Sequence, residues 1–293
     1  MTAWLPRTRT QWIALIAGVV ALVALGLPGP HDTQQALLSY LFAFFFFTGL
    51  CVGSLALLMV HALTGGAWGH YVRAPLLAAA RALPLMALAV IPLLACMRVL
   101  YPWAAPLYDT QLRAQGWYLA DTFFLIRTIV YFMVWLGWLF AIQRNLDDPV
   151  RLRRVAAPGL IVFALTTLLA STDWILSLTP RWHSSVFGMM VGAGWILAAC
   201  ALAVLCACMR EDADAHPPHL LHDLGNLLLA LVLAWAYLAF MQYLTVWVAD
   251  LPDENAWYIP RTLTSWRWLA WFLIVFHFGI PFVLLLSRDL KRR

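Results

Sequence analysis

Two charged side chains fall inside apolar stretches of the sequence, where charge is expensive. Arg127 lies within the apolar run 121–143 and Asp173 within the run 155–176. Inserting such a side chain at membrane depth costs about 2.5–3.5 kcal/mol, so each requires a partner, a water-filled cavity or a function. Because Asp173 can exchange protons while Arg127 keeps it ionised, the pair is typical of the mouth of a proton half-channel or of a quinol site. A structural ion pair that ties two helices together is the alternative, and both remain open.

Other polar side chains extend this pattern along the same runs. Tyr131 follows Arg127 by one helical turn, and Thr166 precedes Asp173 by two turns, so each lies on the same helix face as its charged neighbour. Gln242 and Tyr243 in the run 222–249 lie at a comparable depth. The sequence therefore predicts a polar cluster near one surface of the membrane.

Three more ionisable residues lie in or beside apolar runs. His61 ends the run 37–63, and Arg81 lies about two turns inside the run 74–99. His277 precedes Pro281, a predicted kink, by four residues. Histidine can relay protons near neutral pH, but a hydrogen-bonded core histidine is the commoner case. Arg81 at this depth is expected to extend its guanidinium to the lipid headgroups.

The sequence contains one pattern with the ligand types of a zinc site, and we expect it to bind no metal. It comprises Cys206, Cys208, His216, His219 and His222. Its spacing matches no standard finger, two prolines interrupt it, and its cysteines close an apolar helix. Motifs for covalent haem, iron–sulfur clusters and phosphate loops are absent, so we expect no redox cofactor bound by this chain.

The composition identifies the elements that must position these residues. Of the 293 residues, 63% are hydrophobic and only 11% charged, whereas soluble domains carry about 25% charge. Helix-length apolar runs predict an all-α polytopic membrane protein with about eight transmembrane helices in a single membrane domain. The predicted helices lie near 11–29, 37–63, 74–99, 121–143, 155–176, 185–209, 222–249 and 266–287.

The distribution of basic residues predicts the orientation. Twelve of the 19 Lys and Arg residues lie at the termini and in alternate loops, against four in the opposite loops. By the positive-inside rule both termini are expected in the cytoplasm, with the run 11–29 kept as a first span. The net charge of +5 is dispersed, so nucleic acid is not an expected partner. The connections 100–120 and 250–265 carry Pro, Trp, Tyr and acidic residues, which predicts a structured outer surface.

Several stretches resemble a known family. The stretch from Ser171 to Trp182, continuing to Gly188, resembles the Ser-x-Asp-Trp-x-x-Ser-Leu-x-Pro-x-Trp signature of alternative complex III membrane subunits. These subunits belong to the NrfD-like polysulfide-reductase superfamily. The segments 61–69, 222–261 and 281–291 are similar to the ActF-like subunits of that complex.

The resemblance implies a cofactor-free subunit of a quinol:cytochrome c, or related acceptor, oxidoreductase in the bacterial inner membrane. It implies two four-helix bundles, a proton path, and quinol or quinone contact at the level of the complex. Haem c and iron–sulfur clusters would belong to partner subunits. Expected partners are an ActC-like paralogous membrane subunit, a periplasmic iron–sulfur protein, multihaem or monohaem cytochrome c subunits, a haem–copper oxidase and membrane lipids. Asp173 is the first choice as proton-exchanging residue, and Gln242 and Tyr243 match motif positions.

Two other functions remain open. A purely structural membrane anchor for periplasmic redox subunits would use the same helices and the same ion pair. A stand-alone transporter is less favoured, because transporters often carry paired broken helices in two repeats and we find no matched Gly or Pro interruptions.

Overall fold

Seven helical segments are long and apolar enough to cross a membrane, and the protein is an all-α polytopic membrane protein. The computed structural model describes residues 33–104, 117–179, 182–209 and 218–291. Within these ranges the structure confirms seven of the predicted runs, and the predicted run 11–29 lies outside them. The seven segments are Thr33–Thr64, Ala67–Ala95, Asp121–Arg144, Pro149–Leu178, Phe187–Cys208, Pro218–Ala249 and Arg267–Leu286.

The second of these segments is broken where the sequence predicts one helix over 74–99. Pro84 and Pro92 each begin a new short helix, because proline lacks an N–H donor and clashes with the carbonyl four residues earlier. The segment also starts earlier than predicted, so Arg73, which we expected in a loop, lies on a helix. The pieces are α3 (Ala67–Ala80), α4 (Leu83–Ala89), α5 (Ile91–Ala95) and α6 (Met97–Leu100).

The long helices follow the predicted runs closely, and local chemistry explains where one of them begins. Asp148 caps α8, its Oδ1 accepting hydrogen bonds of 3.1 Å from the backbone N–H groups of Val150 and Arg151. This capping starts the helix about two turns before the predicted boundary. The long helices are α2 (Thr33–Thr64), α7 (Asp121–Arg144), α8 (Pro149–Trp174), α9 (Phe187–Cys208) and α10 (Pro218–Ala249).

The C-terminal region contains a helix that the sequence did not predict. The connection 250–265 is structured, as expected, and most of it forms the amphipathic helix α11 (Pro252–Leu263). The last span is α12 (Arg267–Phe272), the π-helix η5 (Leu273–Gly279) and α13 (Ile280–Leu286), followed by α14 (Arg288–Lys291). The expected irregularity near Pro281 therefore takes the form of a π-helical stretch that ends two residues before it.

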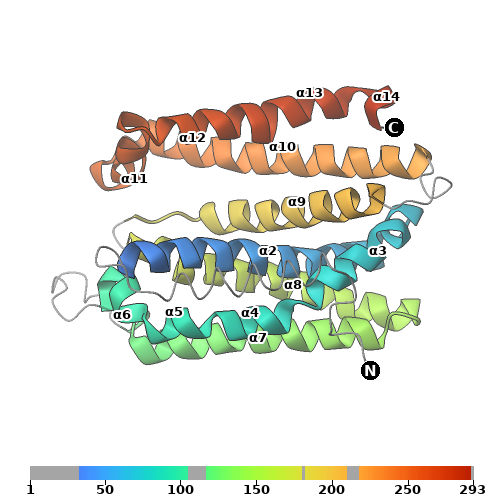
Figure 1. Ribbon diagram of the computed structural model, residues 1–293, viewed down its shortest axis with the longest axis horizontal. Helices are drawn as coiled ribbons and strands as arrows, with labels where there is room; N and C mark the ends of the chain where they lie inside the picture. Colours follow the sequence, from blue (N-terminus) through green and yellow to red (C-terminus); the bar gives the residue numbers. More distant parts are fainter. Residues whose placement is uncertain (1–32, 105–116, 180–181, 210–217, 292–293) are drawn as a thin grey trace.

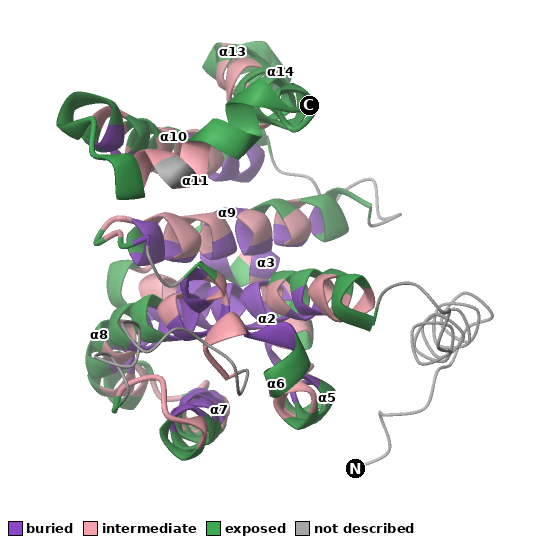
Figure 2. Cartoon of the chain, turned by 90° about the vertical axis from the view of Figure 1, so that its left-hand side faces the viewer, coloured by how far each residue is buried: buried purple, intermediate pink, exposed green. Residues whose placement is uncertain are grey.

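The helices stack in layers with α2 at the centre. Figure 1 shows α12 and α13 beside α10, then α9, then α2 with α8, and finally α4 and α5 with α7. In the most apolar window of α2, 67% of the residues are buried, against none in the last span. Figure 2 shows the same trend, with buried residues in α2 and α9 and exposed ones around α13. The core therefore lies around α2.

One four-helix bundle is apparent among the described helices. It contains α2, the broken segment α3 to α6, α7 and α8, which pack against one another. A second bundle of α9, α10 and the last span would need the run 11–29 as its fourth helix. That run lies outside the described residues, so the two-bundle arrangement remains a prediction.

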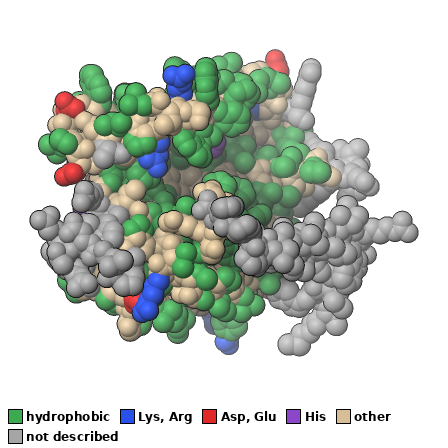
Figure 3. All heavy atoms as spheres, turned by 60° about the vertical axis from the view of Figure 1, so that its left-hand side comes forward, with side chains coloured by type: hydrophobic (Ala, Val, Ile, Leu, Met, Phe, Trp, Pro, Cys, Tyr) green, Lys and Arg blue, Asp and Glu red, His purple; other side chains and the backbone are tan. Residues whose placement is uncertain are grey.

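The two ends of the layered molecule differ in composition. Figure 1 shows α11 and α6 at one end, here called the α11 end, and α14 with the start of α3 at the other, the α14 end. Between the ends, large apolar side chains such as Phe42, Phe140 and Ile161 are exposed. Figure 3 shows apolar side chains over much of the visible face and few charged ones. Such a surface suits contact with lipid chains.

Candidate functional site: a buried carboxylate cluster

The structure brings together the two charges that the sequence singled out. Nε of Arg127 donates to Oδ2 of Asp173 at 2.8 Å, and Nη2 donates to Oδ1 at 2.9 Å. Asp173 is fully buried and Arg127 is 8% exposed. The two residues, which similar depth made natural partners, form a bidentate ion pair between α7 and α8, the geometry in which an arginine binds a carboxylate most strongly.

Tyrosine hydroxyls complete the surroundings of the carboxylate. Tyr131 donates to Oδ2 of Asp173 at 2.7 Å, so Tyr131 belongs to the cluster as predicted. Tyr118, in the segment that leads into α7, also lies close to Asp173. Burial and the negative charge of Asp173 raise the pKa of Tyr118 to about 12, so its hydroxyl stays protonated at neutral pH.

Hydrogen bonds hold the N–H edge of the Arg127 guanidinium, and aromatic rings lie close to it. Nη1 donates to the carbonyl oxygen of Tyr118 at 2.7 Å. The rings of Tyr118 and Phe123 lie 3.9 and 4.4 Å from its central carbon, close enough for cation–π attraction. The sequence analysis did not identify Tyr118 or Phe123 as part of the site. Their only signal was that aromatic residues lie just before and within the first turn of α7.

Neighbouring aromatic residues fix the position of Asp173 on α8. Trp174 is 2% exposed, its indole N–H donates to Thr128 on α7 at 3.2 Å, and its backbone oxygen accepts from Tyr101 at 3.2 Å. These contacts hold the end of α8 against α7 and the segment after α6. The carboxylate therefore occupies a rigid position at the α11 end of the bundle.

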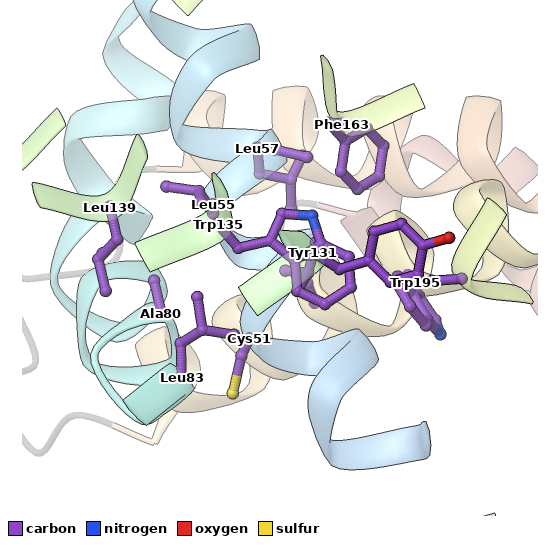
Figure 4. Close-up of a cluster of buried hydrophobic side chains, with 14 of the residues drawn as sticks. Cys51, Leu55, Leu57, Ala80, Leu83, Tyr131, Trp135, Leu139, Phe163 and Trp195 are labelled. Carbon is purple, nitrogen blue, oxygen red and sulfur yellow. The ribbon is translucent and has the colours of Figure 1, made fainter. Parts of the chain in front are cut away.

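The polar face below Asp173 continues for two turns and then meets an apolar core. Trp135 donates its indole N–H to Oγ1 of Thr166 at 2.9 Å, and Thr166 donates to the carbonyl of Val162 at 2.7 Å. Figure 4 shows Tyr131 and Trp135 together among buried apolar side chains that include Leu55. Thr166 thus extends the polar face as expected, with its hydroxyl bonded to its own helix.

Gln242 belongs to a second cluster at the same end. Gln242, 6% exposed, accepts a hydrogen bond from Ser184, which also caps α9 by accepting from the N–H of Phe187 at 3.0 Å. Tyr258 of α11 lies beside Gln242. Burial raises the pKa of Tyr258, while nearby Arg261 and Gln242 oppose the increase. Ser184 and Tyr258 are therefore further site residues; the sequence showed them only as members of the family-like stretches.

A stack of aromatic rings lies beside this second cluster at the α11 end. The rings of Trp182 and Trp257 lie parallel with centroids 4.2 Å apart, and the guanidinium of Arg261 lies 3.5 Å from the Trp257 ring. Tyr243 is 47% exposed and contacts Tyr258 ring to ring at 5.7 Å. Gln242 and Tyr243 therefore help hold α11, and no recorded contact joins them to Asp173 in the described part of the chain.

The three remaining candidates lie apart from the carboxylate. His277 in η5 contacts the ring of Trp235 at 4.3 Å. Nε2 of His61 lies 3.0 Å from the carbonyl oxygen of Gly66, and its ring contacts those of Trp68 and His70. Arg81 follows α3 and is exposed, which fits an arginine that reaches toward headgroups.

The described residues contain no group of three potential metal ligands. In the zinc-like pattern, Cys206 and Cys208 are exposed near the end of α9, and His219 and His222 lie on α10. His216 lies outside the described ranges. The expectation that this pattern binds no metal therefore stays a prediction.

Comparison with protein-family models found no match to this chain, and no curated protein matched it either. The resemblance to NrfD-like subunits rests on the sequence stretches alone.

Proposed function

We propose that the protein is a cofactor-free membrane subunit of a quinol:cytochrome c, or related acceptor, oxidoreductase, in which it supplies a proton path and scaffolds the redox subunits. The observation that carries the proposal is the fully buried Asp173, held by Arg127 and Tyr131 near one end of the membrane spans. Quinol oxidation releases protons, and a carboxylate near the surface can accept and pass them on. The family-like stretch 171–188 contains this residue.

In this role each residue has a specific task. Asp173 exchanges the proton, and Arg127 keeps the carboxylate ionised until a proton arrives. Tyr131, one turn inward of Arg127 on α7, holds Oδ2 of the carboxylate. The cluster is assigned to the periplasmic side of the bacterial inner membrane, with both chain termini in the cytoplasm, by the positive-inside rule.

The proposed partners are those that such chemistry requires. An ActC-like membrane subunit would bind quinol, and a periplasmic iron–sulfur protein with cytochrome c subunits would carry the electrons to an oxidase. A pull-down of the tagged protein in mild detergent, followed by a haem c spectrum and identification of the bands, tests this assembly. Recovery of the protein alone and without haem would contradict it.

The test of the proton path is Asp173→Asn in the assembled complex. We expect quinol oxidation and proton release to fall while assembly persists, because the amide oxygen can still accept from Nε of Arg127 and from Tyr131, but the side chain cannot exchange a proton. Asp121→Asn is the matched control, since Asp121 pairs with Arg98 at 3.2 Å on the exposed surface. Unchanged turnover and proton release in an assembled Asp173→Asn complex would exclude the proton path.

A purely structural anchor is the second candidate, and one observation favours it. Both oxygens of the Asp173 carboxylate accept hydrogen bonds, from Arg127 and Tyr131, as expected of a pair that only ties α7 to α8. In that case Asp173→Asn lowers the yield of complex and leaves turnover per assembled complex unchanged. Substrate uptake by the protein alone in liposomes would instead favour a transporter.

A further inference from the structure

Three hydroxyl groups in the membrane-spanning helices are buried without a hydrogen-bond partner in the described part of the chain. They belong to Thr48 and Ser54 on α2 and to Thr167 on α8, and each residue is at most 1% exposed. A buried polar group without a partner is unfavourable, and in native structures such groups are almost always satisfied by protein or by ordered water. The three hydroxyls therefore indicate a missing partner.

The behaviour of other hydroxyls in these helices makes the three exceptional. A helical Ser or Thr normally donates to the carbonyl oxygen three or four residues earlier. Thr166 does so to Val162 at 2.7 Å, and Thr172 to Leu168 at 2.9 Å. Thr167 lies beside Thr166 on the same helix and makes no such bond. Its hydroxyl is thus available to a partner outside its own helix.

Thr48 and Thr167 lie at similar depth, inward of Asp173, where α2 and α8 face α9. Phe44, one turn before Thr48, contacts the ring of Trp174 at a centroid distance of 5.3 Å. Thr167 precedes Trp174 by two turns on the antiparallel helix α8, so both threonines lie about 6–10 Å inward of that level. On α9, Gly192 approaches the methyl group of Thr167, an ideal Cβ on the glycine lying 3.6 Å from it.

Ser54 continues the same direction toward the α14 end. It follows Thr48 by six residues, a rise of about 9 Å along α2. The adjacent Gly53 packs against the backbone of Trp195 on α9. Asp173 and then Thr167 and Thr48 therefore follow one another inward from the α11 end, on α8 and α2. Ser54 lies deeper on α2 and about 120° around that helix from Thr48, so it faces a different side.

We infer that the interface of α2 and α8 with α9 binds ordered water at Thr48 and Thr167, and that the bound water extends the polar path inward from Asp173. Water is the partner that a buried hydroxyl without a protein partner typically uses, and it can donate and accept at once. Its role in proton transfer rests on the proposed function. Each water or hydroxyl in the chain would accept one proton and release another, so nothing is consumed.

The direct test is the position of water in an experimental structure of the whole protein in lipid, at a resolution that shows ordered solvent. In the wild type we expect solvent density within hydrogen-bond distance of the hydroxyls of Thr48 and Thr167. In Thr167→Val we expect the density beside residue 167 to be lost. Absence of solvent density at both threonines in the wild type would overturn the inference.

Thermal unfolding gives an independent test with a matched control. Valine has the shape of threonine without the hydroxyl. Where the hydroxyl binds water, Thr48→Val and Thr167→Val remove hydrogen bonds, and we expect the unfolding midpoint to fall. Where the hydroxyl is dry, the substitution removes an unsatisfied group, and an unchanged or raised midpoint overturns the inference. Thr166→Val, at a hydroxyl with known partners, must lower the midpoint in either case.

Proton release separates this inference from the proposed function. In the assembled complex we expect Thr167→Val to lower proton release several-fold, as Asp173→Asn does. If Asp173→Asn has this effect and Thr167→Val does not, the inference is overturned and the proposed function stands. If neither variant changes proton release, the proposed function fails, and with it the role of the water in proton transfer. The solvent density then decides whether water is bound at the threonines.

Discussion

At the scale of single residues, the main feature is a charge pair that the protein has removed from solvent. Asp173 receives two hydrogen bonds from Arg127 and one from Tyr131 in a fully buried position. Such a pair contributes little net stability, because desolvation offsets the attraction. Its disruption is costly, because the remaining charge is left buried without a counter-charge. The pair is therefore sensitive to removal of either partner.

Replacing Arg127 should show this asymmetry. We expect Arg127→Leu to destabilise the protein by about 3–5 kcal/mol, because it leaves the carboxylate unpaired. Thermal unfolding followed with a thiol-reactive dye can measure the change, since Cys51 and Cys200 are buried. The double variant Arg127→Leu/Asp173→Leu should recover much of the loss. Arg98→Leu is the control, because its pair with Asp121 is exposed and is expected to contribute about 0–1 kcal/mol.

The Tyr131 hydroxyl should have a smaller effect than Arg127. Tyr131→Phe removes one hydrogen bond to the buried carboxylate and leaves the ring packing intact. A hydrogen bond to a charged group contributes about 1.5–3 kcal/mol, and we expect a loss in that range from the same unfolding measurement. Tyr237→Phe should change nothing, because Tyr237 is 62% exposed. Equal midpoints for the two variants would show that the hydroxyl of Tyr131 does not stabilise the fold.

At the scale of helices, close approach of α2 to α9 organises the core. An ideal Cβ on Gly53 would overlap the carbonyl oxygen of Trp195, and one on Gly49 would overlap the Trp195 ring. Small residues at such positions let transmembrane helices pack backbone to backbone. This contact places Trp195 next to Trp135, with ring centroids 6.3 Å apart, below the carboxylate cluster.

A methyl group added at this contact should separate the helices. We expect Gly53→Ala to destabilise the protein by about 1–3 kcal/mol, because the clash is with backbone atoms that cannot rotate away. Gly137→Ala on α7 is the matched control, since nothing lies within 4 Å of its Cβ position. The control should be neutral or stabilising by up to about 1 kcal/mol, the helix propensity of alanine over glycine. Similar losses at both glycines would contradict this view of the α2–α9 contact.

The amphipathic helix α11 depends on the aromatic stack at its centre. Trp257 lies between Trp182 and Arg261, and Trp257→Ala should release α11 from the rest of the protein. Trypsin cleavage after Arg261 should then become several-fold faster, as measured by the appearance of the two fragments. Trp268→Ala, at a tryptophan that is 66% exposed, should leave the cleavage rate unchanged. An unaltered rate in Trp257→Ala would show that other contacts hold the helix.

At the scale of the whole molecule, the two ends carry different residues. The α14 end has many of the exposed arginines, including Arg151 and Arg154 at the start of α8. The α11 end has the carboxylate cluster, the Trp182–Trp257 stack and the acidic first turn of α11. The positive-inside rule assigns the α14 end to the cytoplasm, which would direct Asp173 toward the periplasm.

Cysteine labelling of intact cells tests this orientation. In a background in which the exposed Cys206 and Cys208 are replaced by alanine, we expect a membrane-impermeant maleimide to label Asp253→Cys and not Arg154→Cys. Permeabilised cells should allow labelling of both, which controls for reactivity. The opposite pattern in intact cells would place the carboxylate cluster on the cytoplasmic side and contradict the proposed direction of proton release.

The sequence by itself determined the fold class, the approximate positions of seven apolar helical segments and the depth of the charged residues along them. Apolar runs of helix length leave few alternatives in lipid, because backbone groups must be satisfied within the helix. Depth follows from position along a helix at a rise of about 1.5 Å per residue, so Arg127 and Asp173 could be assigned a similar depth before the structure, but not a contact. Polar residues at common depth, such as Gln242, could not be assigned to the correct cluster by this argument.

The tertiary structure alone decided which helices are neighbours and which faces they present. A helix that is apolar all round carries no polar stripe from which its rotation can be inferred. Arg127 and Asp173 therefore could be assigned a depth, but not a bidentate geometry or the closure by Tyr118. The close contact of Gly53 with Trp195 and the Gln242–Ser184 cluster depend on the same rotations. The unpartnered hydroxyls of Thr48 and Thr167 are visible only once the helices are packed, because an isolated helix would offer each of them its own backbone carbonyl.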